Sequence, residues 1–180
     1  MTRADYDKIV QDALGMYREA KIALTEEEEA GLEVSDFGLG NLLETGIQLV
    51  VYVNTDTVCA KEIALFPRQI CPEHRHPPLG DYVGKEETFR CRAGTVYIYV
   101  EGEPTPNPRG RVPRGDVAHY TAWHEIVLKP GEQYTLKPNT LHWFQAGEEG
   151  AILSEFSTPS FDDKDIFTNP NIDRLHKLCE

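Results

Sequence analysis

The 180-residue sequence has no run of about 18 apolar residues, the length that a membrane-spanning helix needs. Its first residues, MTRADYDKIVQDALG, carry acidic side chains where a signal peptide has basic and apolar ones. The four cysteines stand singly, without a CxxC pair or the spacing of a disulfide-rich domain. We therefore expect a cytoplasmic protein with reduced thiols and no contact with a membrane.

Basic residues are also scarce. Eighteen lysines and arginines stand against 30 acidic residues, which gives a formal net charge of −12. This excess of negative charge disfavours nucleic acids and anionic membranes as partners. The chain has no internal repeat and no low-complexity tract, and 40% of its residues are hydrophobic, so we expect a single domain that folds without a disulfide or metal staple.

Helical signals are confined to the N-terminal segment 1–45. Thr2 and Asp5 resemble a capping box at the start of a first helix, and Thr25 is placed to cap a second, shorter one. After the glycine-rich SDFGLGN, the apolar period changes from helical to strand-like. We therefore expect 1–45 to form a helical extension that packs on the rest of the domain.

Residues 46–180 show the pattern of a β unit followed by a mixed C-terminal segment. Short runs rich in β-branched and aromatic residues alternate with turns that contain Gly and Pro, which is typical of a closed barrel or jelly roll. A tight turn is expected over 92–94, where Gly94 permits positive φ. The segment 100–117 is expected to be a long loop, either a lid or a surface excursion, and Asn171 is expected to cap a last short helix.

Three of the six histidines form the clearest chemical pattern. His74 and His76 are two residues apart, so on a strand both imidazoles face the same side of the sheet. A carboxylate from a neighbouring strand and a third histidine from a distant strand would complete a set of three nitrogen ligands and one oxygen ligand. Such a set suits Mn, Fe, Co, Ni or Zn. An HxH pair alone more often has a structural role than a metal-binding one. The additional histidine, His142, is what favours a metal site.

These residues resemble the two motifs of the cupin superfamily. In the first, HxH is followed by Glu87 and, after six further residues, by Gly94. In the second motif, Gly131 precedes His142 by eleven residues. The resemblance implies a jelly-roll β-barrel that holds one metal ion through four ligands: His74, His76, Glu87 and His142.

The chain departs from these motifs at three points. Ten residues separate His76 from Glu87, more than the motif has, and Arg68 replaces its leading glycine. Asn139 stands where the second motif prefers glycine, a mild change because asparagine tolerates the left-handed conformation. The adjacent Glu86 stays open as an alternative carboxylate ligand.

A narrower resemblance, to the cupin-type D-lyxose isomerases, runs from about Pro72 to Arg174. Besides HxH it is carried by Lys-x-Glu at 85–87, Pro-x-Thr-x-His-Trp-Phe at 138–144, Ser-Glu-x-Ser at 154–157 and Asp-Ile-Phe-Thr-x-Pro at 165–170. It implies an aldose–ketose isomerase that interconverts D-lyxose and D-xylulose, and also D-mannose and D-fructose. It further implies Mn²⁺, ahead of Co²⁺, Fe²⁺, Ni²⁺ or Zn²⁺, with three nearby working residues: Lys85, Glu155 and Asp165.

The chemistry can be argued from the residue types. An aldose–ketose isomerase moves a proton from C2 to C1 of the sugar, and a divalent metal would neutralise the negative charge that develops on the sugar oxygens. Glu155, between Ser154 and Ser157, is the candidate base, a role worth about 10²–10⁴-fold. Lys85 shares a strand face with Glu87 and could pass a proton between the sugar oxygens, with a pKa lowered by the dication. One ligand set without a second cluster favours a cis-enediolate over a hydride shift.

Other interpretations stay open. Asp165 has the alternative of capping or pairing in the C-terminal segment. Another cupin metalloenzyme, such as a phosphosugar isomerase or an oxygenase, fits the metal motif, and so does a barrel that binds sugar or metal without catalysis. A phosphosugar enzyme needs a basic cluster, for which four residues are candidates: Arg68, Arg75, Arg90 and Arg92.

The remaining ring side chains give weaker signals. Trp143 and Phe144 are candidates for a sugar-facing surface, although at least one is expected in the barrel core. His119 and His124 are five residues apart, so on a strand they face opposite sides, and we assign them to the surface. Apolar barrel edges need cover, which leads us to expect a homodimer.

Overall fold

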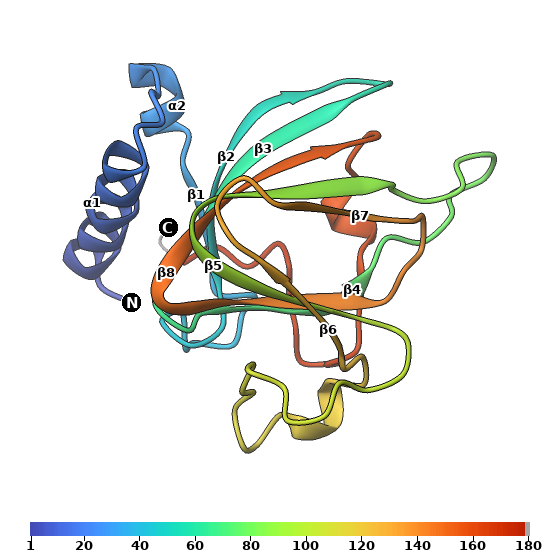
Figure 1. Cartoon of the computed structure of the whole chain (residues 1–180). Helices are drawn as coiled ribbons and strands as arrows, with labels where there is room; N and C mark the ends of the chain where they lie inside the picture. Colours follow the sequence, from blue (N-terminus) through green and yellow to red (C-terminus); the bar gives the residue numbers. More distant parts are fainter. Residues whose placement is uncertain (179–180) are drawn as a thin grey trace.

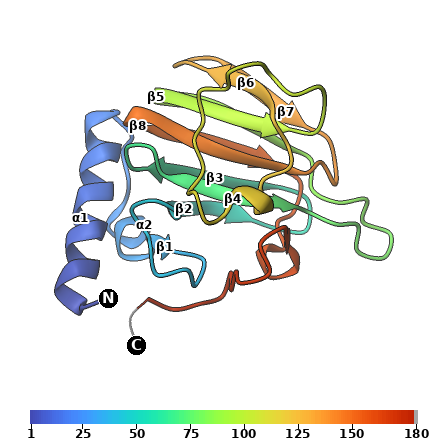
Figure 2. The same ribbon diagram turned by 90° about the horizontal axis from the view of Figure 1, so that it is seen from below.

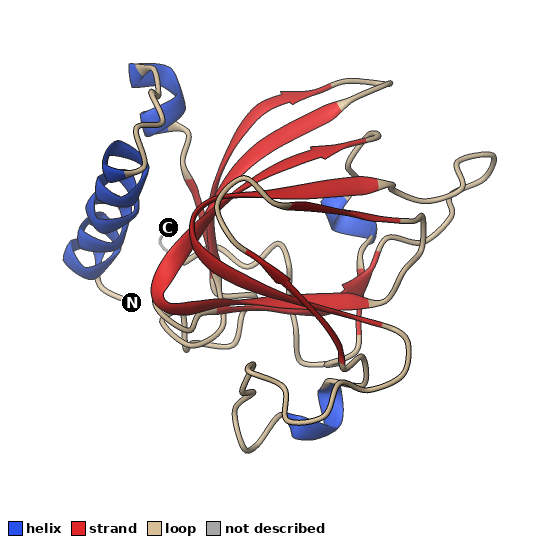
Figure 3. Ribbon diagram, in the orientation of Figure 1, coloured by secondary structure: helices blue, strands red, loops and turns tan. Residues whose placement is uncertain are grey.

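Residues 1–178, the part of the chain that the computed structural model describes, form one strongly curled sheet with two helices along its outside (Figure 1). The helices are α1 (Arg3–Glu19) and α2 (Glu26–Ala30), with short 3-10 helices η1 (Val117–His119) and η2 (Asp162–Lys164). The strands are β1 (Glu33–Ser35), β2 (Ile47–Asn54), β3 (Cys59–Leu65), β4 (Ile70–Arg75), β5 (Glu87–Val100), β6 (His124–Leu128), β7 (Gln133–Leu136), β8 (His142–Ser157) and β9 (Ile166–Phe167). The mainly β, cupin-type barrel predicted from the sequence is confirmed (Figure 3).

Two long antiparallel strands, β5 and β8, run through both walls of the barrel and join them. In one wall the strand order is β1, β2, β3, β8, in which β3 pairs with the second half of β8. The first half of β5 pairs with the same part of β8 on one side and with β7 on the other. In the other wall β9 pairs with β4, and β4 pairs with the first half of β8. The second half of β5 pairs with the same part of β8 and, on its other side, with β6. Segments distant in the sequence therefore face one another across the interior.

The bends of β5 and β8 depend on glycine. The pairing of β5 with β8 shifts register on both sides of Ala93 and Gly94, and Gly94 and Gly150 have φ angles of 71° and 79°. A Cβ at Gly94 would lie 2.0 Å from the carbonyl oxygen of Gly150, so a larger residue would force the strands apart. The turn predicted over 92–94 is therefore wrong, because the glycine bends one continuous strand instead of ending it.

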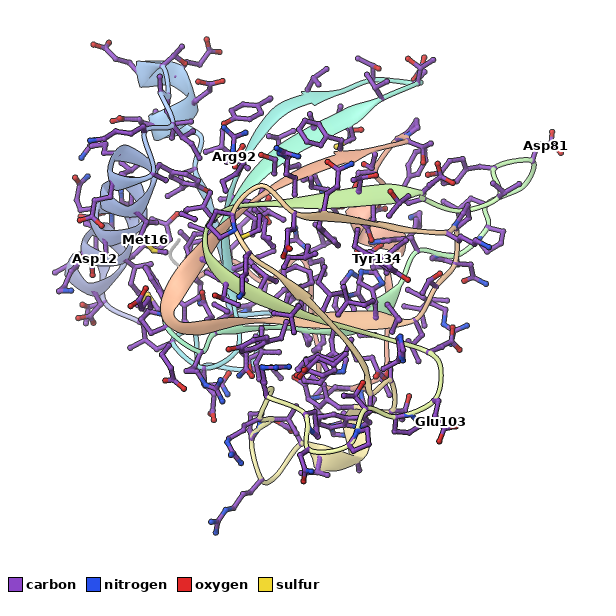
Figure 4. All side chains as sticks on the ribbon, viewed as in Figure 1. Asp12, Met16, Asp81, Arg92, Glu103 and Tyr134 are labelled. Carbon is purple, nitrogen blue, oxygen red and sulfur yellow. The ribbon has the colours of Figure 1, made fainter. Side chains whose placement is uncertain are left out.

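α1 packs against the outer face of the first wall (Figure 2). Its Met16 side chain points toward the barrel and Asp12 points away from it (Figure 4). The buried Tyr17 hydroxyl donates to the backbone carbonyl oxygen of Glu62 in β3 at 2.8 Å. One face of the helix thus covers apolar sheet surface, while the opposite face is polar.

The N-terminal segment confirms two capping predictions and adds a strand. Thr2 forms the expected capping box with Asp5, and Thr25 caps α2 through a second box with Glu28. The segment also supplies β1, which pairs with β2 and which the sequence pattern did not predict. Within the described residues, the structure contains no helix with the length and apolar character needed to cross a membrane.

The C-terminal helix predicted from Asn171 is not formed in residues 171–178. The side chain of Asn169 accepts from the Asn171 N–H at 2.9 Å, and Asp173 accepts from the Leu175 N–H at 3.0 Å. Such local side-chain acceptors offer the backbone an alternative to helical bonds. Together with the preceding residues 158–170, this segment runs along the barrel as a C-terminal strap. It is tied to the barrel by the Asp173 N–H, which donates to the carbonyl oxygen of Phe37.

The loop over 100–117 packs on the outside of the barrel and does not line the interior. Its Gly110 N–H donates to the Tyr99 hydroxyl at 2.5 Å, and the Arg111 N–H donates to the Gln145 side chain at 2.8 Å. Tyr99 in turn stacks on Trp143, with ring centroids 3.9 Å apart. These contacts fix the segment as a covering of the second wall, so the structure favours the surface excursion over the lid.

Candidate metal centre and active site

The three predicted histidines converge inside the barrel. His74 in β4 pairs in register with His142 in β8, and His76 follows two residues later on the same face. Their potential ligand atoms lie within 4.8 Å of one another, and their residues are only 6%, 1% and 8% exposed, respectively. The alternation of strand side chains therefore brings three distant imidazoles to one point.

Each of these imidazoles is oriented by an acceptor at Nδ1. The three partners are the carbonyl oxygen of Pro72 for His74 at 2.8 Å, the carboxylate of Asp165 for His76 at 2.5 Å, and the carbonyl oxygen of Thr140 for His142 at 2.9 Å. An acceptor at Nδ1 selects the tautomer that carries its proton there, which leaves the Nε2 lone pair for a metal.

Glu87 completes the group from the first residue of β5. Its Oε1 atom lies 3.2 Å from Nε2 of His76 and 3.0 Å from Nε2 of His142. All three atoms are buried, and none has a hydrogen-bond partner among the described residues. Unpaired buried polar atoms are costly, and their convergence fits a bound cation. The alternative ligand, Glu86, is exposed at the surface.

The charges of this centre are strongly perturbed. Burial, reinforced by the two neighbouring imidazoles, holds the pKa of His74 well below its usual range. Burial opposes protonation of His76 as well, but the Glu87 and Asp165 carboxylates outweigh it and raise the pKa to about 9. For Glu87 itself, burial is outweighed by Lys85 and the histidines, so its pKa is lowered well below that of an ordinary glutamate.

Lys85 bridges the centre to a second carboxylate. Its Nζ atom lies 2.9 Å from Glu87 Oε2 and 2.5 Å from Glu155 Oε1, and the side chain is only 3% exposed. Burial lowers the pKa of Lys85, but the two carboxylates outweigh it and raise the pKa well above the usual value. The sequence analysis predicted a lowered pKa for Lys85 from the effect of the metal alone. The protein's own charges act in the opposite direction.

Glu155 faces the interior from the second half of β8, where it pairs in register with Lys61 of β3 and Phe89 of β5. The hydroxyl of Ser157, on the same face, donates to Glu155 Oε1 at 3.3 Å. Ser154 does not share this environment, because it points outward and donates to Glu62 at 3.0 Å. Only one of the two serines expected beside Glu155 therefore contacts it.

One open cavity is lined by most of these side chains: His74, His76, Lys85, Glu87, Glu155 and Asp165. Phe144 lines the cavity, whereas Trp143 points away from it and is buried in a separate cluster with Tyr99 and Tyr120. Only one of the two aromatic candidates can therefore face a sugar. The four arginines proposed for a phosphate lie outside the lining of the cavity, and His119 and His124 lie outside the histidine cluster.

Three further charged residues line this cavity and were missed by the sequence analysis. Lys61 Nζ lies 2.8 Å from Asp162 and 3.0 Å from the Ser160 hydroxyl, and Arg174 pairs with Glu33 at 2.5 Å. The alternation of β3 could have identified Lys61, since it shares a face with core residues two and four positions later. Asp162 and Arg174 belong to the irregular C-terminal strap, where no periodicity indicates which side chains point inward.

The fold and the histidine cluster define a cupin-type barrel with a metal-ligand constellation in its interior. Among solved structures, L-ribose isomerase from Acinetobacter sp. DL28 has a TM-score of 0.85, with 16% identity over 100% of this chain and 98% of that one. At this identity the likeness concerns the fold alone.

The chain belongs to the D-lyxose isomerase family, whose sequence profile matches residues 9–180. It is 61% identical to the D-lyxose ketol-isomerase of Thermofilum sp. over 93% of each chain. It is 64% identical to the D-lyxose/D-mannose isomerase of Thermosediminibacter oceani over 89% of each chain. Family membership confirms the resemblance and the sugar isomerase class predicted from the sequence.

Proposed function

We propose that the protein interconverts D-lyxose with D-xylulose, and D-mannose with D-fructose, as a metal-dependent aldose–ketose isomerase. The observation that carries this proposal is one buried constellation in which three imidazole nitrogens and a carboxylate oxygen meet a lysine and a second carboxylate. The names of the relatives support the substrates. The proposed ligands of the metal, with Mn²⁺ as the first choice, are His74, His76, Glu87 and His142.

The chain's own residues supply the proton chemistry in this proposal. A divalent metal in the site would neutralise negative charge on the sugar oxygens. Glu155 takes the proton from C2 and returns it to C1, through a planar cis-enediolate of the sugar. Lys85, in contact with Glu155 and Glu87, donates to the sugar oxygens and moves a proton between them. Asp165 acts through His76, whose ring it orients.

The charge of the cavity favours an unphosphorylated sugar. Its two additional cations are already paired, Lys61 with Asp162 and Arg174 with Glu33 and Asp162. A phosphate would therefore meet several carboxylates and no free basic cluster among the described lining residues. Neutral hydroxyl groups can instead hydrogen-bond to either sign of charge.

A substrate screen tests this function. With the protein loaded with Mn²⁺, we expect D-lyxose to be converted to D-xylulose with the highest kcat/KM and D-mannose to D-fructose with a lower one. The two aldoses share the configuration at C2, where the proton is removed. A preference for phosphorylated aldoses would support the phosphosugar isomerase instead, and loss of activity on these aldoses with metal still bound would support a binding protein.

We also propose that the protein is a homodimer. The outer face of β2, β3 and β8 exposes apolar side chains. Phe156 in β8 and Val53 in β2 both pair with Ala60 in β3, so they lie on adjacent strands at the same level of the sheet. Phe156 is 49% exposed and the nearby Val58 is 50% exposed. A bare apolar sheet face is a surface that proteins usually cover.

Sedimentation tests the dimer. The wild-type protein should have the mass of two chains, and Phe156→Asp should have the mass of one, since the aspartate would be buried in the interface. Val117→Asp, which replaces another exposed valine away from this face, is the control that should stay dimeric. A monomeric wild type would contradict the proposal, as would a dimeric Phe156→Asp variant.

For its location we propose the cytoplasm. Cys59, Cys71 and Cys91 are free and buried, which suits a reducing compartment. Cell fractionation that finds the protein outside the cytoplasm would contradict this.

A further inference from the structure

We propose that Glu73 is a positioning residue for the ligand His74, an inference that rests on the metal site proposed above. Glu73 precedes His74 in β4, so its side chain points to the opposite face, away from the cavity and toward the segment that leads into β6. It is 1% exposed and does not line the cavity. Any effect on the chemistry must therefore pass through its neighbours.

The Glu73 carboxylate is held by four neutral donors. Oε2 accepts from the backbone N–H groups of Thr121 at 2.7 Å and Ala122 at 2.8 Å. Oε1 accepts from the hydroxyls of Thr121 at 2.9 Å and Thr168 at 2.7 Å. A buried carboxylate requires such compensation, and four bonds in four directions leave it a single position. Glu73 thus connects β4 to the segment that leads into β6 and to the C-terminal strap.

The first link from Glu73 to His74 is a bulge in β4. Register with β8 shifts between Cys71 and His74, where Pro72 and Glu73 lie. The carbonyl oxygen of Pro72 is the acceptor that orients His74 Nδ1 at 2.8 Å. Since proline has no N–H to give to the strand ladder, the ladder alone holds this bulge weakly. The anchored side chain of Glu73 supplies the missing restraint.

A second link runs through the C-terminal strap. Thr168 binds Glu73 twice, by its hydroxyl at 2.7 Å and by its N–H to the Glu73 carbonyl oxygen at 3.1 Å. The preceding residue, Phe167, stacks on the His74 ring, with centroids 5.4 Å apart and planes inclined by 30°. Glu73 therefore fixes the aromatic surface that limits rotation of this imidazole.

A third link reaches the neighbour of another ligand. The Ala122 N–H donates to Glu73, and the Ala122 carbonyl oxygen accepts from the Trp143 indole N–H at 2.7 Å. Trp143 follows His142, the register partner of His74. Glu73 and Trp143, the chain neighbours of the two ligand histidines, are thus joined through one residue, Ala122, which restrains the two strands relative to each other.

Cobalt titration of metal-free protein tests this role. We expect Glu73→Ala to bind Co²⁺ about 10- to 100-fold more weakly than the wild type, the usual cost of losing a group that orients a metal ligand. The visible absorption bands of bound Co²⁺ should also change, because they report the geometry of the ligands. Circular dichroism on the same samples confirms that the variant is folded.

Two variants separate positioning from charge and from stability. Glu73→Gln keeps an oxygen for the two N–H donors, and its amide can donate to the two threonine hydroxyls, so its Co²⁺ affinity and spectrum should stay close to wild type. Glu62→Ala removes another buried carboxylate, on the outer face of β3, that shares no partner with Glu73. It should lose stability and keep the Co²⁺ spectrum.

An unchanged Co²⁺ affinity and spectrum in folded Glu73→Ala would overturn the proposal. So would an equal loss in Glu73→Gln, which would point to charge, or in Glu62→Ala, which would point to general destabilisation. Should Glu73→Ala fail to fold, Thr168→Val decides, because it removes one donor and should still shift the Co²⁺ bands. A wild type that binds no Co²⁺ would refute the metal site itself, and is thereby distinguished from failure of the positioning role.

Discussion

The Glu155→Gln variant should keep its metal and lose about 10²–10⁴-fold of kcat, the contribution of a general base. Glu155 is 4% exposed and faces the cavity between Lys61 and Phe89. It is the one carboxylate of the constellation that neither belongs to the four proposed ligands nor binds a ligand ring. An amide in its place cannot accept a proton from C2, whereas the shape of the side chain is unchanged.

The variant should remain folded, which makes the loss of activity interpretable. The amide oxygen can still accept from Lys85 and from the Ser157 hydroxyl, the two contacts of the native carboxylate. The matched control is Glu62→Gln, which neutralises a buried carboxylate on the opposite face of the neighbouring strand and should keep kcat. Steady-state kinetics with a metal assay on the same samples measures both, and full kcat in Glu155→Gln would refute its role as the base.

Deuterium labelling gives the same assignment an independent readout. Turnover of D-lyxose in D₂O by the wild type should place deuterium at C1 of the ketose, because the proton held by the base can exchange with water before it is returned. A hydride shift would transfer the C2 hydrogen without exchange. In Glu155→Gln the incorporation of deuterium should slow together with kcat, and incorporation at the wild-type rate would assign the proton transfer to another group.

The residues at the centre could be predicted because strands obey a strict alternation. His74 and His76 had to face one side of β4, and Lys85 had to lie near Glu87 if the segment was extended. The cupin-like spacing then related these residues to His142, which pairs directly with His74. The same alternation applies to Lys61 on β3, which the sequence analysis missed although it shares a face with core residues of that strand.

The remaining part of the site depends on long-range geometry. Asp162 and Arg174 enter the cavity from the strap, which has no apolar period of its own. Its path depends on contacts with distant parts of the chain, among them the ion pairs with Lys61 in β3 and Glu33 in β1. The bend at Gly94 looked like a turn because the same positive φ serves both. What distinguishes them is the close crossing of Gly150, more than fifty residues later, which no local window contains.

The His74→Ala, His142→Ala double variant should bind no stoichiometric metal and show no measurable isomerase activity. The wild-type protein should carry about one divalent ion per chain by elemental analysis. The double variant leaves only His76 and Glu87 of the four proposed ligands, fewer than the sites that hold such ions usually provide. The matched control, His119→Ala with His124→Ala, removes two histidines that lie outside the cluster and should keep both metal and activity.

Thermal unfolding separates loss of the metal from loss of the fold. Metal that binds only the folded state stabilises it, by roughly 2.7 kcal/mol at about 100 times the Kd. Addition of Mn²⁺ to the stripped wild type should therefore raise its Tm, whereas the Tm of the folded double variant should not respond. Among Mn²⁺, Co²⁺, Fe²⁺, Ni²⁺ and Zn²⁺, we expect Mn²⁺ to restore the highest kcat. Undiminished metal in the double variant would refute the ligand set, and loss of metal in Glu86→Gln but not in Glu87→Gln would move the carboxylate ligand by one residue.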